Sequence, residues 1–205
     1  MTRLGSFAIA MMMAVAAGAC SSDGEIDSNE AARRAYLGLD GSIGKSLTLG
    51  FAGFNSASSA NISPQTVAGV SAGMLTVTGQ VDQGSSDNKG MRLHVGMVAY
   101  TDGEVAIDAD GNTVLVTYDT DADPTLQPFL NLSLKNIPTG TLTGTLVGTY
   151  HMSDDLEGDA TLNLTFSGTL QDDGTGNVIR APGTTQVTGT LTNADNGVYT
   201  VDLKI

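Results

Sequence analysis

The chain has 205 residues, of which 40% are hydrophobic, 26 are glycine and none is tryptophan. It carries 22 acidic residues against 9 basic ones, which gives a formal net charge of −13 at pH 7. Proteins that bind nucleic acid need clustered lysine and arginine to meet the phosphates, so this charge balance excludes DNA and RNA as partners. The length suffices for one hydrophobic core, and a single folded domain is expected.

The first 20 residues have the layout of a secretory leader. Arg3 precedes an apolar run over residues 4–19, which is too short to span a membrane. The run ends at the single cysteine of the chain, Cys20. The small residues before that cysteine are Ala17, Gly18 and Ala19. This segment resembles the leader of bacterial lipoproteins, although that family usually has Leu where this chain has Ala17.

The resemblance implies how the N-terminus is processed. Residues 1–19 would be the signal peptide, with Ala17, Gly18 and Ala19 as the cleavage region. Cys20 would receive the lipid and then carry acyl chains such as palmitate, which anchor the mature protein to a membrane of the bacterial cell envelope. In enteric lipoproteins an Asp after the cysteine retains the protein at the inner membrane, so Ser21 favours the outer membrane. The alternative is an ordinary cleaved signal with a cysteine that carries no lipid.

Residues 20–30 are polar and acidic without any periodicity, and we expect them to form a flexible, lipid-anchored tether. The remainder, residues 31–205, is expected to be one β-rich domain.

The domain begins with a segment of helical spacing at about residues 31–57. Its apolar residues recur every three or four positions: Ala32, Tyr36, Leu39, Ile43, Leu47, Phe51 and Phe54. Asp27 and Glu30 are spaced as in a capping box. Five glycines oppose this assignment, because each costs a helix about 1 kcal/mol relative to Ala. We predict a helix interrupted near residues 40–41. Residues 42–57 could instead form a strand, and residues 55–72 are predicted to be a loop.

From Leu75 onward, apolar and polar residues alternate with a period of two. In residues 141–150 threonine occupies one set of positions, and Leu, Gly or Tyr occupies the other. This pattern is typical of a sheet with one face in the core and one in water, since threonine favours extended backbone and its hydroxyl can meet solvent. Turn residues separate the strands at short intervals. The pattern predicts a mainly all-β fold, an antiparallel meander of eight or nine strands in a barrel or sandwich, with the N-terminal helical segment packed on it.

Two acidic runs have the alternate spacing of oxygen ligands in a calcium loop. The residues are Asp108, Asp110 and Asn112 in the first run and Asp119, Asp121 and Asp123 in the second. Such oxygens can converge on one Ca²⁺, but the match to the EF-hand loop is partial. The alternative is an ordinary hairpin turn, in which Asp, Asn and Gly are common. Ca²⁺ at these runs is the one candidate cofactor.

The other reactive patterns are weak. Residues 69–73 match the G-x-S-x-G pattern of a nucleophile elbow. A nucleophile elbow is followed by a helix, whereas this segment is followed by a predicted strand. His94 and His151 lack the spacing of a zinc site. The sequence therefore predicts an envelope lipoprotein with a non-catalytic structural or partner-binding role, not an enzyme. The alternative is a carrier that holds a lipid or small hydrophobic ligand inside a β-barrel, so the expected partners are the membrane and either an envelope protein or such a ligand.

Overall fold

The structure, a computed structural model, describes residues 24–205. Its elements are α1 (Asn29–Ser56), β1 (Asn61–Ala68), β2 (Ala72–Val81), β3 (Lys89–Thr101), β4 (Glu104–Ala106), β5 (Thr113–Asp119), β6 (Phe129–Lys135), β7 (Thr141–Asp154), β8 (Gly158–Asp172), β9 (Val178–Arg180), β10 (Gln186–Asn193) and β11 (Gly197–Lys204). The predicted signal peptide, its cleavage region and Cys20 lie outside the described residues.

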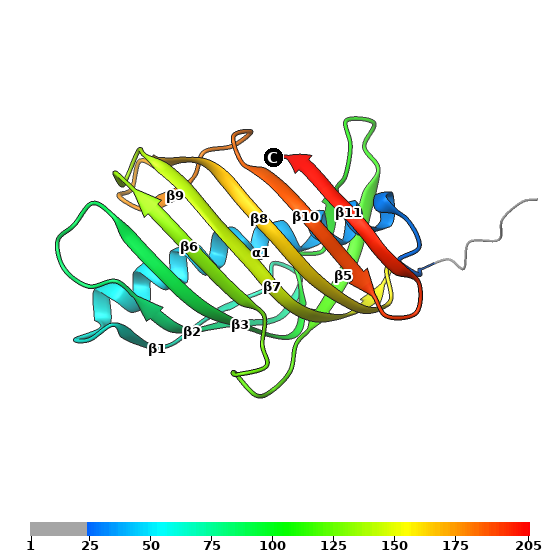
Figure 1. Cartoon of the computed structure of the whole chain (residues 1–205), viewed down its shortest axis with the longest axis horizontal. Coiled ribbons are helices and arrows are strands. Elements are labelled where there is room, and N and C mark those ends of the chain that lie inside the picture. Colours follow the sequence, from blue (N-terminus) through cyan, green and yellow to red (C-terminus); the bar gives the residue numbers. More distant parts are fainter. Residues whose placement is uncertain (1–23) are drawn as a thin grey trace, which may run out of the picture.

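The strands form one antiparallel sheet in the order β1-β2-β3-β5-β7-β8-β10-β11 (Figure 1). β5 and β6 share a single position between β3 and β7, because β5 pairs with one half of each neighbour and β6 with the other. β4 attaches only to β5, and β9 only to β8. The predicted antiparallel meander is confirmed. The structure has eleven strands rather than eight or nine, because one position is split and two short strands are appended.

The sheet is curled but does not close. The two edge strands, β1 and β11, pair with β2 and β10 respectively and not with each other. α1 contacts both of these edges and also β2, β3 and β5, so the sheet curves around the helix. In Figure 1, α1 runs along the long axis of the molecule behind the diagonal strands. The architecture is therefore neither the closed barrel nor the two-sheet sandwich that the sequence allowed, but one open sheet wrapped over a helix.

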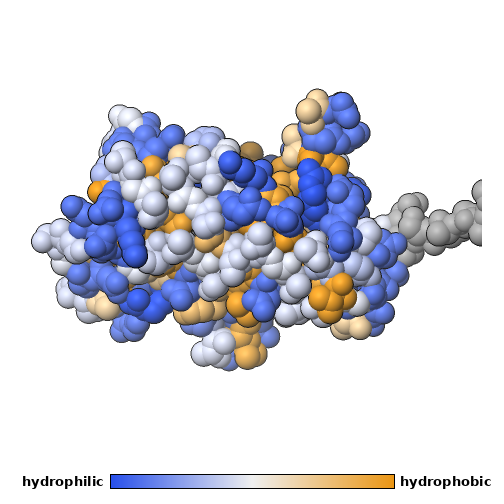
Figure 2. Space-filling view, turned by 45° about the horizontal axis from the view of Figure 1, so that its top comes forward, coloured by the Kyte–Doolittle hydropathy of each residue, from blue (hydrophilic) through white to orange (hydrophobic). Residues whose placement is uncertain are grey.

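The alternation predicted from the sequence sets the two faces of this sheet. Leu162, Leu164 and Phe166 are buried, whereas Thr161 and Thr165, on the alternate positions, are exposed. The buried side chains of the sheet and those of α1 belong to one continuous core. On the face shown in Figure 2, hydrophobic residues occur in small groups between hydrophilic and intermediate ones. The helix thus supplies the second layer that a one-sided sheet needs.

α1 is longer and more regular than expected. It runs without interruption through the predicted break at Asp40, and all of residues 42–56 are helical, which settles the helix-or-strand alternative. Its N-cap is Ser28, whose hydroxyl accepts a hydrogen bond from the Ala31 amide at 3.1 Å, rather than Asp27 of the predicted capping box. The predicted loop over residues 55–72 contains strand β1.

Residues 24–30, the described part of the predicted tether, pack against the fold. Ile26 is completely buried in the core, and Glu25 forms a bridge with Glu157. The sequence did not predict this packing, because Ile26 is a single apolar residue among polar ones and so produces no periodic pattern.

Glycine within α1 allows the helix to lie close to the sheet. A Cβ at Gly38 would lie 2.6 Å from the hydroxyl oxygen of Tyr118, and a Cβ at Gly50 would lie 2.7 Å from the sulfur of Met91. The Tyr118 hydroxyl instead donates a hydrogen bond to the Ala35 carbonyl at 2.6 Å. These tertiary contacts outweigh the low helix propensity that suggested a break.

Candidate ligand-binding groove

A groove follows the side of α1 that the sheet leaves uncovered. It consists of three adjoining hollows with volumes of about 340, 390 and 360 Å³, a size typical of small-ligand sites. The first two share Gly44, Ile179 and Arg180, and the second and third share Thr48. The hollows therefore succeed one another from the middle of α1 to its C-terminal end.

The floor of the middle hollow is the surface of α1, where Lys45 and Leu49 line the hollow along with three smaller residues. Gly41 and Gly44 lie there, together with Thr48 one turn further on. One wall is Val67 of β1, and the other is Ile179 of β9. Because β1 is an edge strand and β9 an appended one, the groove lies where the curled sheet stays open.

An ion pair at the first hollow ties β9 to α1. Nη1 and Nη2 of Arg180 each donate a hydrogen bond to one carboxylate oxygen of Asp40 at 2.8 Å, and the Tyr36 hydroxyl donates to the same carboxylate at 2.8 Å. Burial lowers the pKa of Arg180, but the hydrogen bonds and charge of Asp40 outweigh this effect and raise it. Because both guanidinium nitrogens bind the carboxylate, this bidentate pair fixes the position of β9 relative to α1.

A second ion pair holds the turn after β3 against α1. Lys45 donates hydrogen bonds to Asp102 and to the Tyr100 hydroxyl, and the Val70 amide donates to the same Asp102 oxygen at 2.9 Å. Burial raises the pKa of Asp102, but the hydrogen bonds from Lys45, Val70 and Tyr100 bring it below its ordinary value. Both cations of the first two hollows are thus neutralised by carboxylates of the protein itself.

The third hollow contains a buried cation in a different situation. Lys89 is only 5% exposed, and its ammonium group lies 4.4 Å from the centre of the Phe54 ring and donates to the Gly84 carbonyl. Within residues 24–205, it forms no salt bridge. The hollow is otherwise lined by aromatic, aliphatic and amide side chains, including Phe51, Ile137 and Asn177.

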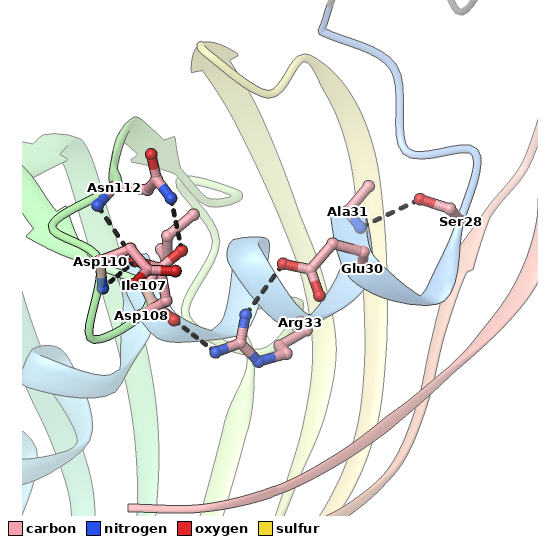
Figure 3. A network of polar contacts seen from close by, with 8 residues as sticks. All are labelled: Ser28, Glu30, Ala31, Arg33, Ile107, Asp108, Asp110 and Asn112. Atoms are coloured by element: carbon pink, nitrogen blue, oxygen red, sulfur yellow. Dashed lines mark hydrogen bonds and ion pairs between the residues drawn. The ribbon is translucent and has the colours of Figure 1, made fainter.

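The first predicted calcium run forms a self-contained turn between β4 and β5. The Asp108 carboxylate accepts hydrogen bonds from the backbone amides of Asp110 and Asn112 at 3.0 and 3.1 Å and from Nδ2 of Asn112 at 2.7 Å (Figure 3). The Asn112 side chain contributes most to lowering the pKa of Asp108. Arg33 of α1 joins Glu30 to the Ile107 carbonyl and so attaches this turn to the helix.

The second run begins at Asp119, the last residue of β5, and continues into the loop that separates β5 from β6. Asp119 accepts a hydrogen bond from the Ala99 amide, Asp121 from the Asp123 amide, and Asp123 from the Thr125 amide. The two runs flank the seven-residue strand β5, so they lie about 20 Å apart. In the part of the chain that the structure describes, no three His, Cys, Asp or Glu side chains are grouped as metal ligands. The six residues are not brought together, and Ca²⁺ binding at either run stays a prediction.

The weak catalytic patterns are dispersed in the fold. Gly69–Gly73 spans the turn after β1 and the first two residues of β2, and a hydrogen bond from the Gly69 amide to the Gly73 carbonyl closes it. His94 is half-buried against Phe129, with ring centres 5.1 Å apart, whereas His151 is exposed and pairs with Asp159 at 2.6 Å. Neither histidine is hydrogen-bonded to Ser71.

The sequence contained a signal for the third hollow that the motif search missed. Lys89 lies on the same face of β3 as Met91, Leu93 and Val95, whose side chains are buried. A lysine at a core-facing position of a strand therefore indicates a buried cation. Arg180 likewise lies at an alternate position to the buried Val178, on the same face of β9. Its partner Asp40 is 140 residues away and could not be inferred from spacing.

Comparison with known proteins gave no match, whether with family models, curated proteins or solved structures. Within residues 24–205, none of the helices has the combined length and apolar character needed to cross a membrane.

Proposed function

We propose that this protein is a lipid-anchored, non-catalytic component of a bacterial cell envelope whose domain binds a small ligand in the groove along α1. The groove carries the proposal. Three hollows of ligand size adjoin along α1, and Gly44 lines the first two of them.

The lipoprotein-like leader supports the anchoring. The anchor would be Cys20, with the outer membrane as the favoured location because Ser21 follows it. α1 is a 28-residue helix, about 42 Å long at about 1.5 Å per residue, and the described chain begins at its N-terminal end. The third hollow, at the other end of α1, would therefore face away from the anchored end.

A carrier role remains compatible with the groove but not with a ligand in a barrel interior. The concave side of the sheet is filled by α1, whose Tyr36 ring lies 6.2 Å from the ring of Phe166. A hydrophobic ligand would instead bind on the outer side of the helix.

The anchor is tested by acyl labelling in a bacterial host. Labelled lipid should appear on the full-length protein, its processing should be blocked by globomycin, and Cys20→Ser should abolish both. An unlabelled wild-type protein would contradict the anchor.

Ligand binding is tested by native mass spectrometry of protein extracted from its envelope. We expect a bound small molecule that is lost in Thr48→Trp, which fills the junction of two hollows. Thr141→Trp is the matched control, because Thr141 is exposed on the other face of the sheet and should keep the ligand. A ligand retained in Thr48→Trp, or specific turnover by the purified protein, would refute the proposal.

A further inference from the structure

The third hollow encloses a positive charge that the described part of the protein does not balance. Lys89 opens β3 on the core-facing side, paired with Leu134 of β6. Its ammonium makes one hydrogen bond to a carbonyl and contacts one aromatic ring. Removing an ammonium group from water costs several kcal/mol unless a counter-charge compensates, and no salt bridge is formed to Lys89 within residues 24–205.

Asp82, a carboxylate near Lys89, is committed elsewhere. The charge of Lys89 contributes to lowering the pKa of Asp82, but Asp82 is bound to Arg92 at 2.7 Å and accepts a hydrogen bond from the Gly90 amide at 2.9 Å. The influence of Lys89 is the smallest of the causes that lower the pKa of Asp82. The lysine therefore keeps its attraction for an external anion.

The surroundings of Lys89 define the rest of the ligand. Phe51, Phe54, Ile137 and Val178 provide apolar surface, and Asn55 adds an amide at the margin. A single cation matches a single negative charge. A polyanion would bring unneutralised charge into a protein whose net charge is already −13.

We propose that this hollow binds the carboxylate of a small organic acid with an apolar body, with the carboxylate on Lys89 and the body against the phenylalanine rings. This inference rests on the proposed function, because it names the class of ligand for one part of the groove. The competing explanation is structural. α1 has no basic residue in its last turn, and Lys89 lies beside that turn, where a cation stabilises the helix dipole.

Binding of octanoate, 1-octanol and octylammonium to the full folded protein separates charge from apolar contact. We expect octanoate to bind at least about tenfold more tightly than 1-octanol, and octylammonium to bind most weakly. Equal affinity for octanoate and 1-octanol would overturn the inference.

Variants of Lys89 then assign the charge. Lys89→Met should weaken octanoate binding by about tenfold or more and leave 1-octanol nearly unchanged, while Lys89→Arg should retain the preference for octanoate. Lys135→Met is the matched control, because Lys135 lies at the end of neighbouring β6 but is exposed, and it should change binding less than about twofold. Unchanged octanoate binding in Lys89→Met would assign Lys89 to the structural role and overturn the inference.

The proposed function can fail separately from this inference. If octanoate does not bind while the envelope-derived ligand still depends on Thr48, the carboxylate assignment is wrong and the groove remains a binding site. If neither ligand binds, both proposals are wrong.

Discussion

The glycines of α1 allow a prediction in which the same substitution has opposite effects at two positions. Gly38 faces Tyr118, and a Cβ there would lie 2.6 Å from the hydroxyl oxygen. Gly44 faces the groove, and the nearest atom to its Cβ, Nη2 of Arg180, is 3.9 Å away. Both positions lie inside α1, so the helix-propensity gain from alanine is the same.

The magnitudes follow from the contacts. At Gly44 the gain in propensity is unopposed, and Gly44→Ala should stabilise the protein by about 0.5–1 kcal/mol. At Gly38 the same gain is opposed by overpacking against a rigid ring that is 1% exposed, which typically costs about 1–3 kcal/mol. Displacing the Tyr118 hydroxyl from the Ala35 carbonyl would cost about 0.5–1.5 kcal/mol more. Gly38→Ala should therefore destabilise the protein by about 1–3 kcal/mol.

Urea unfolding of the two variants measures this difference. With a slope of about 2 kcal/mol per molar urea, Gly38→Ala should lower the midpoint by about 0.5–1.5 M, and Gly44→Ala should raise it by about 0.3–0.5 M. Tyr118→Phe removes the atom that clashes, so Gly38→Ala/Tyr118→Phe should be more stable than the sum of the single changes predicts. If Gly38→Ala stabilises the protein as much as Gly44→Ala does, the close approach of α1 to the sheet is wrong.

Three further predictions concern the ion pairs and the two faces of the sheet. The pKa of Asp102 is lowered in the folded protein, so its contribution to stability is present above the unfolded pKa of about 3.9 and is lost as the pH falls through the folded pKa. The free energy of unfolding in acid should therefore depend less on pH in Asp102→Asn than in the wild type. An unchanged pH profile would contradict this. Arg180→Met leaves Asp40 half-buried without its partner and should lower the free energy of unfolding by about 2–4 kcal/mol, whereas a loss below about 0.5 kcal/mol in thermal unfolding would mean that β9 is not clamped. Leu164→Ala should cost about 2–5 kcal/mol and Thr141→Val less than about 0.5 kcal/mol, and similar costs for both would reverse the assignment of the faces.

The sheet was predictable because its signal is local. Most of the longer strands from Leu75 onward carry their own alternation, and turn residues mark their ends, so strand type and the buried face follow without knowledge of the partners. Closure is different. Whether β1 meets β11 depends on the curvature of the whole sheet and on what fills its concave side.

The helix was only partly predictable, since propensity and packing disagree along it. Gly38 and Gly50 weaken an isolated helix, yet in the fold they are the positions where Tyr118 and Met91 approach most closely. β1 was missed for a related reason. It is an edge strand with one buried residue, Ile62, so it lacks the alternation that identified the others.

The candidate site was the least predictable part. The groove combines the outer face of α1 with β1, β9 and the loop ends of the sheet, and its ion pairs join residues far apart in sequence. The acidic runs at residues 108–112 and 119–123 were predicted as calcium sites because the spacing of their oxygen-bearing residues is visible in the local sequence. Their carboxylates accept backbone amides, as turn-forming Asp residues commonly do.

The position of α1 connects the architecture to the proposed ligand. An open sheet leaves backbone donors and acceptors unpaired along its two edges, and a helix that contacts both edges shields them with side chains. At Gly41 and Gly44 this cover has no side chain, and the ion pairs of Asp40 and Lys45 hold the neighbouring segments in place on either side. A larger residue at Gly44, where the nearest atom to an added Cβ is 3.9 Å away, would bury more surface, whereas an added Cβ at Gly41 would lie 2.6 Å from a carboxylate oxygen of Asp102. Stability alone would favour a larger residue at Gly44, so the glycine at this position agrees with the proposed groove, whose far end contains the buried Lys89.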